Sequence, residues 1–154
     1  MLKFSTYILS FALLTLGFGR ESNRSEIKLT TYSRDAQHKV ISNDLIKEQY
    51  EKYANNKPLS IIIRTLPNPE EKQFYSFSEK QPPFFTNNAL KFLSNVVEHL
   101  VVDVPSIDRM ADDGILGNHR IFWSNNGSPT DSVQANSKKT ITELAYVPND
   151  VEDG

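Results

Sequence analysis

The chain contains two short apolar segments, Leu59-Ser-Ile-Ile-Ile-Arg64 and His99-Leu-Val-Val-Asp-Val104. Both are rich in β-branched residues and lack alternation with polar side chains, which is typical of strands that are buried on both faces. A helix is expected between them, because Thr86 is a plausible N-cap for a run with apolar residues on one side. Strand, helix and strand in this order predict a parallel pair joined by a right-handed crossover.

The core of the protein is expected to form around this unit. The apolar side of the helix comprises Ala89, Phe92, Leu93, Val96 and Val97. The side chains expected to be largely buried are Ile61, Ile62, Ile63, Phe92, Leu93, Val96, Leu100, Val101 and Val102. The sequence therefore predicts an α/β domain with a βαβ core.

The segments before the helix add further elements to this unit. A strand is expected over residues 27–32, and residues 42–44 offer capping side chains for a second helix. The apolar residues of this helix recur at the spacing of one helical face and are Ile46, Tyr50 and Tyr53. Residues 66–85 include four prolines separated by polar residues and therefore predict a long loop.

The last third of the chain is less regular. Residues 114–123 predict a polar turn that carries His119 and leads into an apolar end. Residues 124–139 are rich in Ser, Asn, Gly and Thr and predict an exposed, mobile loop. Apolar and polar residues alternate over residues 140–147, which predicts a strand that includes Glu143. A carboxylate there is costly to bury unless it is paired, protonated or bound to a metal, although a solvent-facing Glu on an edge strand is common.

The composition is that of an ordinary globular domain. The chain has 154 residues, 38% apolar and 23% charged, with a formal net charge of −2, which argues against a disordered or multi-span membrane protein. The lack of a basic excess argues against nucleic acid as the main partner. The chain has no cysteine, so disulfides, thiolate metal sites and a cysteine nucleophile are excluded. With three histidines, any metal site must combine few imidazoles with carboxylates.

The N-terminus has the anatomy of a secretory signal. Lys3 precedes an apolar run from Phe4 to Phe18, which ends in the small residues of Gly17-Phe-Gly19. A run of about fifteen residues is short for a membrane span, which needs about 20. We therefore expect a signal peptide over residues 1–19 and a secreted or periplasmic chain without a membrane span. The alternative is that residues 7–16 form a buried element of a cytoplasmic protein.

Polar side chains follow the two central strands of the predicted sheet. Ligands of open α/β sheets usually bind beyond the carboxyl ends of the parallel strands. Arg64 lies at the end of the first strand, and the end of the second strand and the loop after it contain Asp103, Ser106 and Asp108. They are therefore candidates for contact with a small-molecule substrate. The alternative is that Arg64 and Asp103 simply pair with each other.

The second half of the chain contains three motifs in succession. They are His99-Leu-Val-Val-Asp-Val-Pro-Ser-Ile-Asp108, Asp113-Gly114 with Gly117-Asn-His-Arg-Ile-Phe-Trp123, and Thr140-Ile-Thr-Glu-Leu-Ala-Tyr-Val-Pro148. Upstream are Ile61-Ile-Ile-Arg-Thr-Leu-Pro-Asn68 and the segment from Pro82 to Phe92. From about residue 28 onward, the chain thereby resembles the cyclase family of metal-dependent hydrolases. This family includes the bacterial-type kynurenine formamidases of tryptophan catabolism.

The resemblance implies both a chemistry and a fold. A divalent metal, Zn²⁺ or Mn²⁺, would activate water against a formamide, cyclic amide or ester such as N-formylkynurenine. The implied metal ligands are His119 and Glu143, whose ligating atoms should approach within about 5 Å. Asp103, Ser106 and Asp108 would shape the adjoining turn and orient ligands. The implied fold, over residues 27–154, is a partial swivelling β/β/α-type domain with a mixed sheet, and such proteins commonly form homo-oligomers.

One expected motif is missing from the chain. Family members carry an upstream His-x-Gly-Thr-His-x-Asp motif with the primary metal ligands, whereas His38 is the only histidine before these motifs. His119 and Glu143 are two ligands, and a catalytic zinc usually has three from protein. The sequence thus predicts a truncated or divergent member. Three functions remain open: an impaired hydrolase, a non-catalytic remnant or binding module that keeps the family core, and a half-site completed by a second chain.

Overall fold

The computed structural model describes residues 24–29, 33–35, 38–53, 58–78, 81–124, 128–130, 132 and 138–151. The predicted signal peptide over residues 1–19 lies outside the described residues. Most of the polar loop predicted over residues 124–139 also lies outside them. None of the helices in the described part of the chain is long and apolar enough to cross a membrane.

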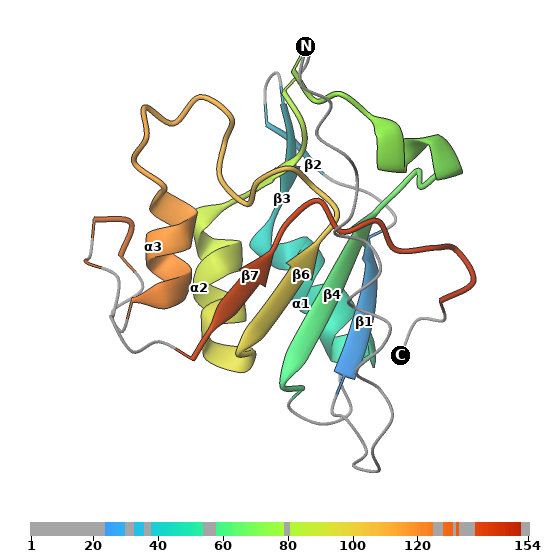
Figure 1. Cartoon of the computed structure of the whole chain (residues 1–154). Coiled ribbons are helices and arrows are strands. Elements are labelled where there is room, and N and C mark those ends of the chain that lie inside the picture. Colours follow the sequence, from blue (N-terminus) through green and yellow to red (C-terminus); the bar gives the residue numbers. More distant parts are fainter. Residues whose placement is uncertain are drawn as a thin grey trace.

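Four parallel strands form the main sheet, in the order β1-β4-β6-β7 (Figure 1). These strands are β1 (Arg24–Leu29), β4 (Ser60–Thr65), β6 (His99–Val102) and β7 (Thr140–Thr142). The predicted parallel pair is confirmed by β4 and β6, in a register that sets Ile61 beside Leu100. Helix α2 (Asn87–Val96) lies between them in the chain, so the βαβ core and the α/β class are also confirmed.

A second, smaller sheet contains the only antiparallel pairing among the described strands. It has the order β2-β3-β5, with β2 (Ser33–Asp35) antiparallel to β3 (His38–Ile41) and β3 parallel to β5 (Phe84–Phe85). This second sheet is mixed, whereas the described main sheet, which contains the βαβ core, is parallel throughout. The backbone N–H of Phe85 donates to the carbonyl of Ile107, which joins this sheet to the segment that follows β6.

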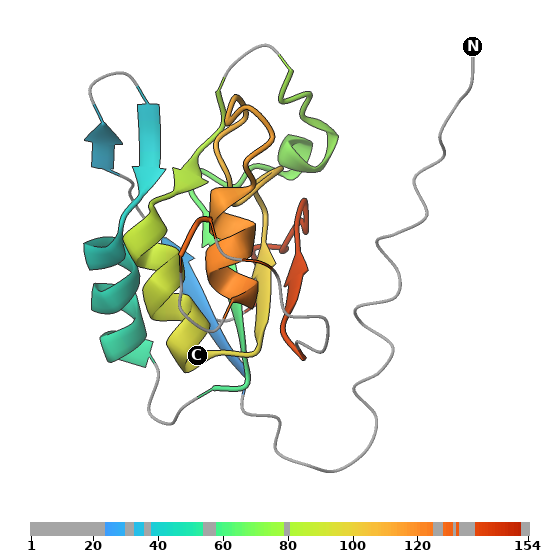
Figure 2. The ribbon, with the colours of Figure 1, turned by 90° about the vertical axis from the view of Figure 1, so that its left-hand side faces the viewer.

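Three α-helices cover one face of the main sheet (Figure 2). Two of them, α1 (Asn43–Tyr53) and α2, begin at side chains that the sequence offers as caps. The hydroxyl of Ser42 accepts the N–H of Leu45, and the hydroxyl of Thr86 accepts the N–H of Ala89. Each hydroxyl satisfies one of the amide groups that a helix N-terminus leaves unpaired. The third helix, α3 (Gly117–Trp123), packs beside α2.

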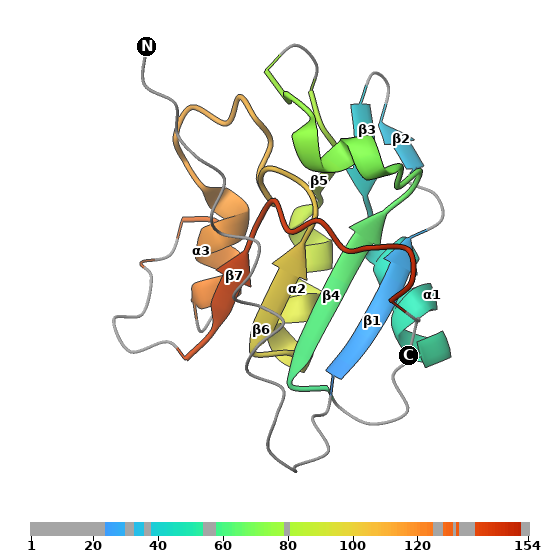
Figure 3. The same cartoon turned by 45° about the vertical axis from the view of Figure 1, so that its right-hand side comes forward.

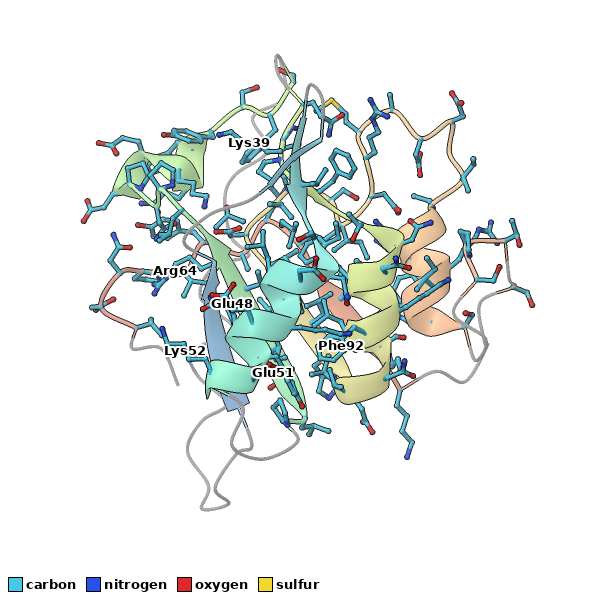
Figure 4. All side chains as sticks on the ribbon, turned by 180° about the vertical axis from the view of Figure 1, so that it is seen from behind. Lys39, Glu48, Glu51, Lys52, Arg64 and Phe92 are labelled. Carbon is cyan, nitrogen blue, oxygen red and sulfur yellow. The ribbon has the colours of Figure 1, made fainter. Side chains whose placement is uncertain are left out.

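The core lies between the main sheet and these helices. Among the residues predicted to be buried, Ile61, Ile62, Ile63, Leu93, Leu100 and Val102 are buried. The other three, Phe92, Val96 and Val101, are partly buried, and Phe92 and Val96 pack against this core. Val101 alternates with Leu100 and Val102 along β6, so its side chain points away from the helices. Phe92 lies at the junction with α1, where its ring packs edge-on against Tyr50 at 5.3 Å (Figure 4).

Three segments differ from the expected pattern. The predicted loop over residues 66–85 contains a short 3₁₀ helix, η1 (Glu70–Phe74), and the strand β5. His119 lies in α3 rather than in a polar turn, because the helix begins two residues earlier, at Gly117. The strand expected over residues 140–147 ends at Thr142, so Glu143 lies just beyond it. The physical reason is at Leu144, whose left-handed φ of 57° is incompatible with a continued strand.

Candidate functional site

Three segments meet at the carboxyl ends of β6 and β7. They are the turn of residues 106–108 after β6, the first turns of α3, and the residue that follows β7 (Figure 3). The segment after β7 stays close to β6, because the N–H groups of Leu144 and Ala145 donate to the carbonyls of Val104 and Val102. This arrangement brings together His119 from α3, Glu143 from the end of β7 and Asp108 from the turn.

His119 lies between two carboxylates. Its Nδ1 is 2.5 Å from Oδ2 of Asp108, and its Nε2 is 3.4 Å from Oε1 of Glu143. The prediction that His119 and Glu143 approach within about 5 Å is therefore confirmed. Their role as metal ligands stays a prediction, which the proximity makes sterically feasible.

Backbone amides hold both carboxylates in place. Oε1 of Glu143 accepts the N–H of Ile107 at 2.8 Å, and Oδ1 of Asp108 accepts the N–H of Asn118 at 2.6 Å. Ser106 stabilises the same turn, because its hydroxyl accepts the N–H of Asp108 at 3.1 Å. The turn of residues 106–108 therefore supplies Asp108, which contacts the imidazole, and the N–H group of Ile107, which holds Glu143.

Opposing effects act on the pKa of His119. Burial is the largest and lowers it, because it disfavours the charged imidazolium. The hydrogen bond with Asp108 and the negative charges of Glu143, Asp108 and Asp112 together outweigh burial, so the pKa is raised above its ordinary value. The carboxylates around His119 therefore favour the protonated form of its ring.

The separation of 3.4 Å between Nε2 of His119 and Oε1 of Glu143 suits a shared cation. It exceeds the usual hydrogen-bond range of about 2.7–3.2 Å. Two donors that each lie ~2.0–2.2 Å from one tetrahedral ion are about 3.4 Å apart. The fit is nevertheless incomplete, since the described residues contain no group of three His, Asp or Glu side chains that could hold a metal ion.

Known protein families give no information on the chemistry of this site. The chain matches no model of a known protein family and no curated protein. A nitrogen donor and a carboxylate oxygen are ligands that both Zn²⁺ and Mn²⁺ accept. His119 supplies one nitrogen donor and Glu143 one carboxylate donor.

Left-handed backbone conformations flank both candidate ligands. Leu116, which precedes α3, has a φ of 52°, and Leu144, which follows Glu143, has a φ of 57°. Such conformations are rare for bulky residues and are concentrated at functional sites. The left-handed residue Leu144 directly follows Glu143, just beyond the end of β7, and Leu116 directly precedes the helix that carries His119.

Arg64 and Asp103 have separate partners at the end of the sheet. Arg64 is fully buried, and its guanidinium donates to the backbone carbonyls of Val147, Pro148 and Val151 (Figure 4). Asp103 forms an ion pair at 2.6 Å with Lys72 of η1 and accepts hydrogen bonds from the N–H and hydroxyl of Thr65. These contacts anchor the C-terminal segment and η1, so both residues have structural partners in addition to any role towards a ligand.

The pKa of Asp103 is raised. Burial is the largest cause and raises it, while the charge of Lys72 and the hydrogen bonds from Lys72 and Thr65 lower it by less. The alternative that Arg64 and Asp103 pair with each other is therefore wrong, because Asp103 pairs with Lys72 and Thr65 while Arg64 binds backbone carbonyls.

Sequence reasoning missed three residues that shape the site. Asn118 is buried, and its amide donates to the carbonyls of Phe85 and Ile107, which ties α3 to the turn. The ring of Trp123 lies 5.3 Å from that of His119, and Lys72 reaches Asp103 from η1. Only Trp123 could have been found from the sequence, because it lies four residues after His119 and residues four apart in a helix share one side.

Proposed function

We propose that this chain is a metal-dependent hydrolase of the cyclase type, with His119 and Glu143 as ligands of a divalent cation. The observation that supports the proposal is the 3.4 Å approach of Nε2 to Oε1 between two residues that are far apart in the sequence. The proposal includes the swivelling β/β/α fold of that family and a formamide, cyclic amide or ester as the substrate. Zn²⁺ and Mn²⁺ are the cations that the two donor types favour.

Electrostatics support a cation at this position. Two carboxylates flank the imidazole, and a third, that of Asp112, adds negative charge nearby. The same field that raises the pKa of His119 attracts a metal ion, which competes with the proton for Nε2. A divalent ion held by His119 and Glu143 would lower the pKa of its bound water towards ~7 and would polarise a substrate carbonyl.

A second candidate function is a non-catalytic binding module. It is favoured by the number of donors, because a catalytic zinc usually has three protein ligands and the described residues group only two around the site. In this case the chain would bind a cation or a small molecule at the same place without turnover. The two candidates share the site and differ in whether hydrolysis follows.

Metal binding is tested by calorimetry with Zn²⁺ and Mn²⁺ on the purified chain. We expect wild type to bind one ion, and His119→Ala and Glu143→Gln each to weaken binding by at least about tenfold. His99→Ala is the matched control, because His99 contacts Thr140 at the opposite end of β6 and β7. Equal binding by wild type and by both site variants would show that the ligands are assigned wrongly.

Hydrolysis separates the two candidate functions. N-Formylkynurenine and a simple aryl ester are incubated with the chain and either ion. Metal-dependent turnover that is lost in His119→Ala supports the hydrolase. Metal binding through the same residues without turnover of either substrate supports the binding module.

A further inference from the structure

The side chain of Asp108 makes two contacts of different kinds. It is only 5% exposed. Oδ1 accepts the backbone N–H of Asn118 in the first turn of α3, and Oδ2 lies 2.5 Å from Nδ1 of His119. A carboxylate has no proton to donate when it is ionised, so His119 must carry the shared proton on Nδ1.

We infer that Asp108 is a positioning residue that fixes the tautomer and the rotation of the His119 ring. With Nδ1 protonated, neutral His119 has its free electron pair on Nε2, which is the nitrogen that faces Glu143. The inference rests on the proposed function, since an electron pair at Nε2 matters only if a ligand or a proton is received there. Histidine ligands in proteins commonly have such a second partner, which sets their orientation.

The same turn also sets the position of Glu143. The N–H of Ile107, the residue before Asp108, donates to Oε1 of Glu143, which is the oxygen that faces His119. One turn therefore holds the nitrogen donor through a side chain and the oxygen donor through the backbone. Both donors of the candidate site are therefore in contact with residues 107 and 108.

The variant Asp108→Asn separates the positioning role from the structural one. Its amide has one oxygen, which the N–H of Asn118 requires as an acceptor, so its NH₂ group must face His119. Nδ1 must then accept, which moves the ring proton to Nε2 and removes the electron pair there. The helix contact is kept, while the tautomer is reversed.

The first measurement is long-range ¹H–¹⁵N NMR of the imidazoles in the metal-free protein at alkaline pH, with His119→Ala to identify the signals of His119. We expect Nδ1 to be protonated in wild type and Nε2 to be protonated in Asp108→Asn. A wild-type spectrum with the proton on Nε2 would overturn the inference, even if the variant fails to fold.

The second measurement is the affinity for Zn²⁺. We expect Asp108→Asn to bind about 10–100-fold more weakly than wild type. Asp113→Asn is the control for lost charge, because Asp113 is exposed on the neighbouring loop and Asn tolerates its left-handed φ of 56°, and it should weaken binding less than about fivefold. Wild-type affinity in a folded Asp108→Asn protein would overturn the inference and leave the metal site standing. A correct wild-type tautomer without any Zn²⁺ binding would refute the metal site and leave the positioning role standing.

Discussion

At the scale of single residues, the site depends on one ring with three neighbours. His119 contacts Asp108 and Glu143 through its nitrogens, and its ring lies 5.3 Å from that of Trp123, tilted by 51°. Trp123 is the only tryptophan of the chain, and its indole N–H donates to the carbonyl of Lys139. The intrinsic fluorescence of the protein therefore reports on His119.

The raised pKa of His119 predicts how fluorescence and stability depend on pH without metal. An imidazolium quenches a neighbouring indole, so the emission of Trp123 should rise with pH, with a midpoint above the ordinary histidine value of about 6.5. Because the folded pKa is raised, the stabilisation is fully present below the unfolded pKa and is lost as pH rises through the folded pKa. Urea unfolding from pH 5 to pH 9 measures this loss.

His119→Gln provides the control for both measurements. It should remove the fluorescence transition and flatten the dependence of unfolding free energy on pH above about 6. A transition with the same midpoint in His119→Gln would assign it to another group.

The ion pair of Lys72 and Asp103 predicts non-additive effects on stability. The side chains are 8% and 1% exposed, so removing either partner leaves a buried charge without compensation. Lys72→Met and Asp103→Asn should each lower the free energy of unfolding by about 3–5 kcal/mol. The double variant should lose clearly less than the sum of the two, as measured by urea denaturation. Simple additivity would contradict the pairing.

At the scale of elements, local sequence signals and tertiary contacts act together. The start of α2 follows from its cap at Thr86, whereas its buried side is decided by its position between α1 and α3. Leu90 is fully buried and Phe92 is half-buried, although the apolar pattern alone ranks Phe92 with the core. The pattern identifies a helix with an apolar side, and the neighbouring helices determine the limits of that side.

The cap of α2 predicts a modest loss of stability. Thr86→Ala removes the hydroxyl that accepts the N–H of Ala89, and it should lower the free energy of unfolding by about 0.5–2 kcal/mol. Thr142→Ala is a matched control, because Thr142 is exposed at the end of β7, and it should change stability by about 0.5 kcal/mol or less. Thr86→Ser, which keeps the hydroxyl, should behave nearly as wild type in the same urea titration.

At the scale of the whole molecule, the segment after β7 crosses the carboxyl ends of the neighbouring strands (Figure 1). Arg64 of β4 and Asn68 hold it there, since Asn68 donates to the carbonyl of Val147 and exchanges hydrogen bonds with Asn149. Glu143 is the first residue of this segment. Its position relative to His119 therefore depends on contacts made several residues further along the chain.

Arg64→Met tests this dependence. The variant leaves the carbonyls of Val147, Pro148 and Val151 without the guanidinium, at a cost of about 1–3 kcal/mol for each one that stays unpaired. We expect faster amide hydrogen exchange over residues 144–151 and a weaker affinity for Zn²⁺, although Arg64 contacts neither candidate ligand in the described hydrogen-bond network. Unchanged exchange in this segment would show that it is held by other contacts.

The sequence by itself determined the parts of this protein that depend on neighbouring residues. The apolar runs of β4 and β6 and the caps at Ser42 and Thr86 follow from patterns within a few residues, and the parallel pairing follows from the order of strand, helix and strand. The tertiary structure alone decided that Asp108 contacts Nδ1 of His119, and that Lys72 reaches Asp103. It also decided that β7 ends before Glu143. The physical reason is that periodicity and capping act over one or two turns, whereas these contacts depend on where distant segments cross the end of the sheet.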